Sequence, residues 1–161
     1  MGSGKTIVGR RLAQQTGLSF ADTDRFIEMQ QGMTVSEIFA RHGEAAFRKM
    51  EHDILLKIQT FDDVVVSTGG GMPCYSDNME IMRSCGAVAY LKASPQELTR
   101  RLLRSHNERP LISGKTENEL QQYIVEKLKE REPFYNRAHI IVETENFSME
   151  ELLQALNLTK D

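Results

Sequence analysis

Four short apolar runs, each bounded by polar residues or glycine, divide the chain into alternating segments. The runs cover residues 18–21, 64–67, 87–91 and 139–142, and their composition is typical of strands buried on both faces of a parallel sheet. The stretches between them carry apolar residues at helical spacing, as in the stripes Phe47, Met50, Ile54, Ile58 and Leu120, Tyr123, Ile124, Leu128. This alternation predicts an α/β fold with a parallel sheet covered by helices on both faces, forming a single domain over residues 1–161.

Helix boundaries are also visible in the sequence. Four segments begin with a Ser or Thr that is followed three residues later by Glu, which predicts a capping box: Thr34 with Glu37, Ser94 with Glu97, Thr116 with Glu119, and Ser148 with Glu151. Because proline lacks a backbone N–H, Pro133 predicts the end of the helix that contains Leu128.

The chain opens with Met1-Gly2-Ser3-Gly4-Lys5-Thr6, which matches the second half of the phosphate-binding loop G-x-x-x-x-G-K-[ST]. In such a loop backbone amides and the following helix N-terminus surround a phosphate, the lysine contacts the β- and γ-phosphates, and the threonine hydroxyl ligates Mg²⁺. We expect the loop's opening glycine and its preceding strand to lie upstream of Met1. Two alternatives remain open, namely an ordinary glycine-rich turn and an N-myristoylation signal.

Composition narrows the class of protein. The 161 residues carry a net charge of -3, so no overall positive field favours nucleic acid, and an anionic substrate requires local Lys and Arg groups. No apolar run has the length of a membrane span. Cys74 and Cys85 form no C-x-x-C pair and are expected to be reduced thiols. We therefore expect a cytoplasmic domain that binds neither nucleic acid nor membranes.

Two polar or glycine-rich segments follow predicted strands, at the sheet edge where α/β proteins bind ligands. Asp22-Thr23-Asp24 places two carboxylates after the run 18–21. One could hold Mg²⁺ and the other could accept a hydrogen bond from a substrate hydroxyl, although a helix N-cap followed by a first-turn acid is the simpler interpretation. Gly69-Gly70-Gly71 follows the run 64–67, and three glycines suggest bare backbone against a ligand.

Three arginines are candidates for binding anions. Arg48 lies between Glu44 and Glu51 at helical spacing, which indicates either a surface ion pair or a guanidinium held in place for a ligand carboxylate. Arg131 extends the apolar stripe past Leu128, so it requires an anionic partner, either a substrate or a glutamate. Arg109 lies in the polar stretch 105–115, where it could close over ATP or remain a solvated loop residue.

The motifs taken together resemble those of the shikimate kinase family over nearly the whole chain. G-S-G-K-T, D-T-D, T-V-S-E-I-F-A-R-H-G-E-A-A-F-R-K-M-E, S-T-G-G-G, R-P-L and R-E-P-F-Y occur in the family's order. The resemblance implies the three-layer P-loop kinase fold of that family, which has a five-stranded parallel sheet with a central P-loop strand, here apparently missing, and a mobile lid. The lid corresponds to about residues 105–116, and the substrate-binding helices to about residues 22–59.

The resemblance also implies a reaction: transfer of the γ-phosphoryl group of ATP, with Mg²⁺, to the 3-hydroxyl of shikimate by a monomeric enzyme. The implied contacts with ATP involve Gly2, Ser3, Gly4, Lys5, Thr6, Ile7, Arg104 and the lid arginine Arg109. The implied contacts with shikimate involve Asp24, Arg48, Gly69, Gly70, Gly71 and Arg131. The implied metal site consists of Thr6 and Asp22, and the implied catalytic residues are Lys5, Asp24 and Arg109.

Two further functions remain possible at this point. One is another small-molecule P-loop kinase, such as a gluconate-type kinase, because gluconate also carries a carboxylate and hydroxyls. The other is a weakly active nucleotide-binding protein, because the front half of the phosphate-binding loop is absent from the sequence.

Overall fold

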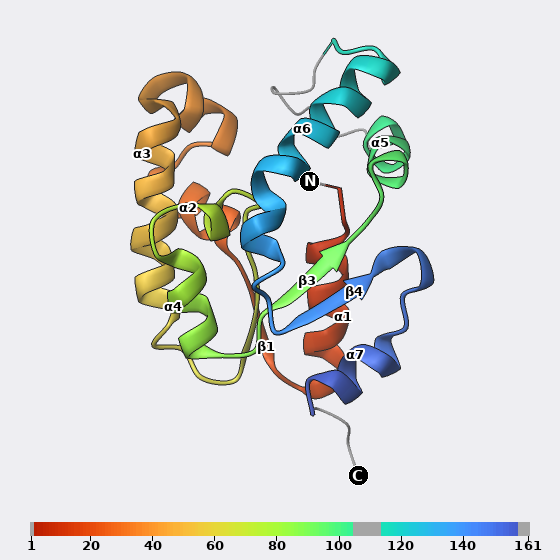
Figure 1. The fold of residues 1–161 in the computed structure, drawn as a ribbon. Helices are drawn as coiled ribbons and strands as arrows, with labels where there is room; N and C mark the ends of the chain where they lie inside the picture. Colours follow the sequence, from red (N-terminus) through yellow and green to blue (C-terminus); the bar gives the residue numbers. More distant parts are fainter. Residues whose placement is uncertain (1, 105–113, 158–161) are drawn as a thin grey trace.

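The computed structural model describes residues 2–104 and 114–157 (Figure 1). The four strands are β1 (Ser19–Asp22), β2 (Val64–Ser67), β3 (Ala89–Lys92) and β4 (Ile140–Glu143). The α-helices are α1 (Lys5–Thr16), α2 (Thr23–Gln31), α3 (Val35–Ile58), α4 (Asn78–Cys85), α5 (Pro95–Arg104), α6 (Glu117–Tyr135) and α7 (Met149–Ala155). The short 3-10 helices are η1 (Met72–Cys74) and η2 (Thr144–Asn146). The α/β fold and the four strand positions are therefore confirmed to within two residues.

All strand pairing in the described residues is parallel, as predicted. β1 pairs with β2, and β3 pairs with β4, so the structure holds two separate two-stranded sheets rather than one continuous sheet. Within residues 2–104 and 114–157, no strand bridges β2 and β3. Asp22 is opposite Ser67 in the first pair, which brings the segments that follow β1 and β2 to the same edge.

Helices pack around the strands in three apolar clusters. α1 packs against β1 and β2, α2 against α3, and α5 against α6. Figure 1 shows α2, α3 and α4 grouped on one side of the molecule, with α5 and α6 on the other. Buried residues of the predicted stripes anchor both groups: Phe47, Ile54 and Ile58 in α3, and Leu120 and Ile124 in α6. One helix of each group, α3 and α6, contacts η1, which follows the glycine segment after β2.

The predicted capping boxes form at two of the four helices. Thr34 and Thr116 each exchange hydrogen bonds with the glutamate three residues later. At α5 only half of the capping box forms. The Glu97 amide donates to Ser94 Oγ, but the Glu97 carboxylate pairs with Arg100 and Arg101, and the Ser94 amide donates to Glu145 instead. Ser148 likewise accepts from the Glu151 amide without the reciprocal bond. The expected end of α6 at Pro133 is also wrong.

Helix α6 continues through Pro133 to Tyr135. A proline in the last turn removes a single backbone hydrogen bond, and the Asn136 amide still donates to the Glu132 carbonyl at 2.8 Å. This extra turn carries Tyr135 to the glycine segment that follows β2, which it contacts.

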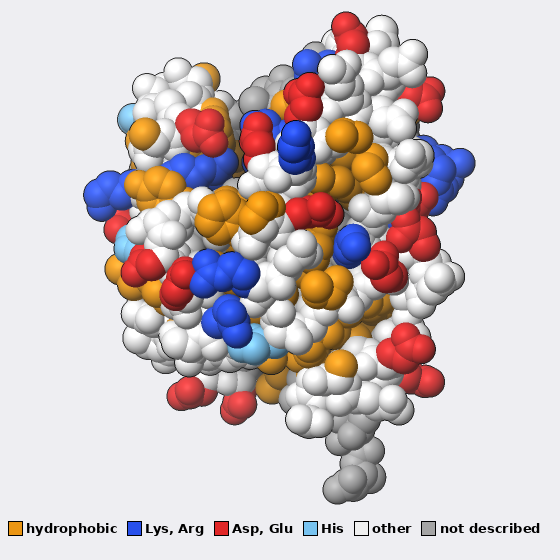
Figure 2. Space-filling view, viewed as in Figure 1, with side chains coloured by type: hydrophobic (Ala, Val, Ile, Leu, Met, Phe, Trp, Pro, Cys, Tyr) orange, Lys and Arg blue, Asp and Glu red, His pale blue; other side chains and the backbone are white. Residues whose placement is uncertain are grey.

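The surface agrees with the modest net charge. Acidic and basic side chains are interspersed over the face shown in Figure 2. Among the described residues, no helix combines the length and apolar character needed to cross a membrane.

Candidate active site

The phosphate-loop fragment leads directly into helix α1. Gly4 precedes the helix with φ 90°, and Gly2 has φ 68°, so both adopt the left-handed conformation that glycine tolerates best. α1 then runs from Lys5 to Thr16 and ends at Gly17. The Arg101 guanidinium donates a 3.3 Å hydrogen bond to the Ser3 carbonyl, which ties this segment to α5. The fragment therefore has the loop-to-helix geometry that suits an anion.

Thr6 and Asp22 meet across the junction between α1 and β1. The Thr6 hydroxyl donates to Asp22 Oδ2 at 3.1 Å. Asp22 Oδ1 also accepts from the Asp24 amide at 3.2 Å, so Asp22 is the N-cap of α2, as the simpler interpretation held. The two roles are compatible because they use different oxygens. Two hard oxygen donors side by side suit Mg²⁺, and in the described residues no cluster of three His, Cys, Asp or Glu could hold a metal alone.

Asp24 and Glu51 form a pair of buried carboxylates beside the glycine segment. Asp24 Oδ1 and Glu51 Oε1 are buried, and neither has a hydrogen-bond partner within the described part of the protein. A Cβ atom added to Gly69 would lie 2.5 Å from Glu51 Oε1 and 2.8 Å from Asp24 Oδ1, so any larger residue at this position would clash with both oxygens. Two orphaned acceptors side by side require donors, and ligand hydroxyls would supply them.

The charges around these carboxylates set their pKa values. Burial raises the pKa of Asp24 above its usual value, Asp22 raises it further, and Lys5 and Arg48 oppose the shift. Burial also raises the pKa of Glu51 to about 6, against the effect of Arg48. Asp24 is therefore within electrostatic reach of the phosphate-loop lysine on one side and of the Arg48 guanidinium on the other.

Arg48 is held by two glutamates of its own helix. Its Nη2 atom lies 2.8 Å from Glu44 Oε1, and Nη1 lies 2.5 Å from Glu51 Oε2. Glu51 is only 1% exposed, so this is a buried ion pair rather than the surface pair of the simpler interpretation. Burial alone would lower the pKa of Arg48, but Glu51 and Glu44 outweigh it and raise the pKa. The guanidinium is thus charged and fixed in place.

Three contacts hold the segment Gly69-Gly70-Gly71. The Gly69 amide donates to Thr23 Oγ1 at 3.1 Å, and the Tyr135 hydroxyl donates to the Gly70 carbonyl at 2.5 Å. The space that a Gly71 Cβ would occupy is filled by the Arg48 guanidinium. Protein side chains occupy the space beside Gly69 and Gly71, and the expected contact of this backbone with a ligand stays a prediction.

Arg131 approaches the same place from helix α6. Its positive charge lowers the pKa values of Glu51, Cys74 and Tyr135 against the larger effect of burial. The Arg48 charge acts in the same direction on all three. Arg48 and Arg131, which are 83 positions apart in the sequence, therefore influence the same three side chains.

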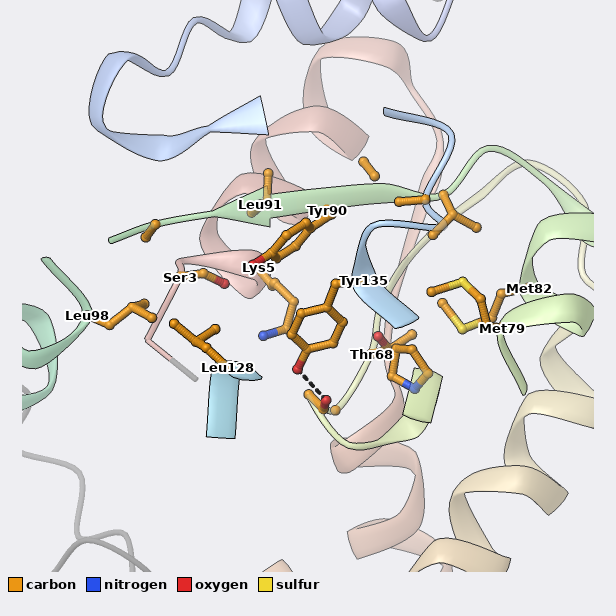
Figure 3. A pocket seen from close by; sticks show the side chains of 17 residues that line it. Ser3, Lys5, Thr68, Met79, Met82, Tyr90, Leu91, Leu98, Leu128 and Tyr135 are labelled. Atoms are coloured by element: carbon orange, nitrogen blue, oxygen red, sulfur yellow. Dashed lines mark hydrogen bonds between the residues drawn. The ribbon is translucent and has the colours of Figure 1, made fainter. Parts of the chain in front are cut away.

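A pocket joins the phosphate-loop segment to the glycine segment. Ser3, Lys5, Thr68, Gly69, Gly70 and Tyr135 are among the residues that line it. Figure 3 shows the Lys5 side chain beside the Tyr135 ring, with the Tyr135 hydroxyl bonded to the glycine segment. The pocket thus contains the lysine expected to bind phosphate and the backbone expected to border the substrate.

Other predicted residues lie outside this group. Ile7 is 68% exposed on α1, and Arg104 is exposed at the end of α5. Arg109 and most of the expected lid fall in 105–113, outside the described residues.

Sequence reasoning assigned no role to Thr23, Tyr135 or Arg101, although each of them anchors part of the site. Thr23 could have been noticed as a small polar residue between two aspartates, and Tyr135 as a tyrosine four positions after Arg131. No sequence pattern singled out Arg101.

The chain is similar to known proteins over almost its whole length. A family model described as shikimate kinase matches residues 1–158. The chain is 46% identical over 150 residues to the shikimate kinase of Parabacteroides distasonis, an alignment that covers 93% of this chain and 87% of that protein. It is 41% identical over 155 residues to the shikimate kinase of Phocaeicola vulgatus, with 96% and 89% covered.

Solved structures give the same picture. The crystal structure of shikimate kinase from Bacteroides thetaiotaomicron matches with a TM-score of 0.94 and 37% identity, over 98% of this chain and 94% of that one. The structure titled shikimate kinase from Acinetobacter baumannii in complex with shikimate matches with a TM-score of 0.84 and 37% identity, over 96% and 84% of the two chains.

Proposed function

Because the chain belongs to the shikimate kinase family, we propose that the carboxylates, arginines and glycines gathered at the ends of β1 and β2 form its catalytic site. The reaction is transfer of the γ-phosphoryl group from ATP to the 3-hydroxyl of shikimate. Shikimate presents one carboxylate at one end of its ring and hydroxyl groups at the other. The site offers arginines that can bind the carboxylate and a buried Asp24 oxygen that can accept from a hydroxyl.

Arg48 and Arg131 bind the shikimate carboxylate in this proposal. Both guanidinium groups influence the pKa values of Glu51, Cys74 and Tyr135, which supports their assignment to one ligand carboxylate. A guanidinium offers parallel N–H groups that match a carboxylate, which an ammonium cannot do. The Glu44 and Glu51 carboxylates fix the direction of Arg48 before the ligand arrives.

Asp24 holds the hydroxyl that is phosphorylated, and its orphaned Oδ1 is the observation that carries the proposal. That oxygen is buried and has no hydrogen-bond donor among the described residues. The charges of Lys5 and Arg48 both lower the pKa of Asp24, against the larger effect of burial. A shikimate hydroxyl donating to Oδ1 would satisfy the oxygen and direct the hydroxyl toward the phosphate loop. In the reaction, the hydroxyl oxygen forms a bond to the γ-phosphorus, the bond to the ADP oxygen breaks, and Asp24 accepts the hydroxyl proton.

The start of α1 binds ATP. Backbone amides around Gly2, Ser3 and Gly4 surround the phosphates, and Lys5 contacts the β- and γ-phosphates. Thr6 and Asp22 would hold Mg²⁺, since their oxygens already lie 3.1 Å apart. When bound, Mg²⁺ neutralises charge on the β- and γ-phosphates.

The remaining assignments belong to the same proposal. Residues 22–59 bind shikimate, and residues 105–116 form a lid that brings Arg109 to ATP. Ile7 and Arg104 border the nucleotide. We propose that the enzyme acts as a monomer in the cytoplasm.

Substitution of Arg48 by alanine tests the site directly. We expect Arg48→Ala to weaken shikimate binding by about 10- to 100-fold, because a hydrogen bond to a charged group contributes about 1.5–3 kcal/mol. ATP binding is expected to stay unchanged, and isothermal titration measures both. Lys49→Ala is the matched control, because Lys49 makes only an exposed ion pair with Asp53. Equal losses of both ligands, or unchanged shikimate binding, would contradict the assignment of Arg48.

A further inference from the structure

One hydrogen bond links the end of helix α6 to the glycine segment. The Tyr135 hydroxyl donates to the Gly70 carbonyl at 2.5 Å, across 65 positions of sequence (Figure 3). Burial raises the pKa of this phenol, so it remains a hydrogen-bond donor at neutral pH. The Tyr135 ring packs against the Tyr90 ring with centroids 4.9 Å apart, which limits the directions the hydroxyl can take.

The peptide between Gly70 and Gly71 has little else to hold it. The Gly69 amide is bound by Thr23, and the Gly69 and Gly71 carbonyls accept from the Met72 and Cys74 amides. In the described part of the chain, the Gly70 carbonyl accepts only from Tyr135, and neither the Gly70 nor the Gly71 amide donates to a protein group. Two consecutive glycines impose almost no steric limit on the rotation of the peptide between them.

The orientation of this peptide matters to a ligand. In a trans peptide the C=O and the following N–H point in opposite directions. The Gly70 carbonyl is directed at Tyr135, so the Gly71 N–H is directed away from Tyr135. Gly71 borders the Arg48 guanidinium, which occupies the space of a side chain there. The Gly71 amide lies next to Arg48 and has no protein acceptor among the described residues, so it can donate to an acceptor on a bound ligand.

We infer that Tyr135 is a positioning residue for shikimate, which acts by holding the Gly70–Gly71 peptide in the orientation that presents its N–H to the substrate. Arg131 lies one helical turn before Tyr135. Its charge and a side-chain hydrogen bond lower the pKa of the Tyr135 phenol, against the larger effect of burial. Helix α6 thus contributes the Tyr135 hydroxyl to the pocket and places the Arg131 guanidinium near that hydroxyl. The inference rests on the proposed function, because it assumes that the segment 69–71 borders shikimate.

Substitution of Tyr135 by phenylalanine removes the hydroxyl and keeps the ring. We expect the KM for shikimate to rise about 3- to 10-fold, as for the loss of one uncharged hydrogen bond. The kcat is expected to stay within about twofold of wild type, and the KM for ATP to stay unchanged, since a positioning effect acts on substrate binding. Shikimate titration calorimetry at low temperature gives the same comparison if the variant melts earlier than wild type.

Tyr90→Phe is the matched control. Tyr90 packs on the same ring, and its hydroxyl is buried with no hydrogen-bond partner among the described residues, so its loss breaks no hydrogen bond. An unchanged shikimate KM in Tyr135→Phe, an equal rise in Tyr90→Phe, or equal losses for both substrates would overturn the role of Tyr135. Arg48→Ala separates the two proposals. If Arg48→Ala still binds shikimate normally, the proposed site itself is wrong. If Arg48→Ala binds shikimate more weakly but Tyr135→Phe has an unchanged KM, only the role of Tyr135 fails.

Discussion

Replacement of Gly71 by alanine would place a methyl group in the space that the Arg48 guanidinium occupies. The Gly71 backbone has φ -90° and ψ -22°, which alanine adopts without strain. The new Cβ would lie 2.5 Å from Nη2 and even closer to Nη1 and the guanidinium carbon. Ordinary carbon contacts need about 3.5 Å, so the guanidinium must move by roughly 1 Å or more. The variant therefore perturbs Arg48 without altering Arg48 itself.

The magnitude follows from the interactions that Arg48 loses. A displaced guanidinium cannot make its charge-assisted bonds to the shikimate carboxylate, which contribute about 1.5–3 kcal/mol, so we expect the shikimate KM to rise about 10- to 100-fold. The KM for ATP is expected to stay within about twofold, because the phosphate loop is untouched. The fold itself is expected to lose up to about 3–5 kcal/mol, because displacement of Arg48 leaves the buried Glu51 carboxylate without its ion-pair partner.

A coupled assay for ADP production, with each substrate varied in turn, measures both KM values. Gly86→Ala is the control, because Gly86 has an extended backbone and an added Cβ would meet no atom within 4 Å. A shikimate KM that matches wild type in Gly71→Ala, or an equal rise in the KM for ATP, would refute the reasoning.

Two other predictions follow from the site. Burial raises the pKa of Glu51 from 4.5 to about 6. The folded state therefore binds this proton more tightly than the unfolded state. As the pH rises from 4.5 to above 6, the contribution of Glu51 to the free energy of unfolding falls by about 2 kcal/mol. Glu51→Gln should lack this loss in urea unfolding measured at both ends of that range, and a pH dependence identical to wild type would contradict the shift. Lys5→Ala is expected to lower kcat by at least about 100-fold in the coupled assay, because Lys5 is assigned to the charge on the transferring phosphoryl group; unchanged turnover would mean that the loop is not catalytic.

Local sequence signals predicted the fold well. The strands could be placed because short apolar runs between polar residues and glycines leave few other structures. The start of the phosphate-loop helix could be placed because Gly4-Lys5-Thr6 ends the loop motif, and Gly4 adopts the left-handed conformation in the structure. The end of α6 was misplaced because the effect of a proline depends on its position in the helix, and Pro133 lies in the last turn.

The composition of the site was accessible from motifs, but its geometry was not. Arg48 and Arg131 were singled out individually, whereas their convergence depends on how α3 and α6 pack around the strands. The pairing of Asp24 with Glu51 at Gly69 joins three parts of the sequence, and no local pattern reports it. Tyr135 was overlooked because its partner is a backbone carbonyl 65 positions away, which leaves no signature in the sequence.

The choice of substrate came from the resemblance and agrees with the relatives described above. A carboxylate and several hydroxyls are common to shikimate and gluconate, so the paired arginines and acids do not separate them. The named relatives and solved structures are all shikimate kinases, which favours shikimate over the gluconate-type alternative.

A crystal structure of this chain with shikimate and a non-hydrolysable ATP analogue tests the central claim most directly. The account predicts that the shikimate carboxylate lies within hydrogen-bond distance of Arg48 and Arg131, that a ring hydroxyl donates to Asp24 Oδ1, and that the γ-phosphate group contacts Lys5. A shikimate carboxylate bound away from both arginines, or a nucleotide bound away from the start of α1, would contradict it.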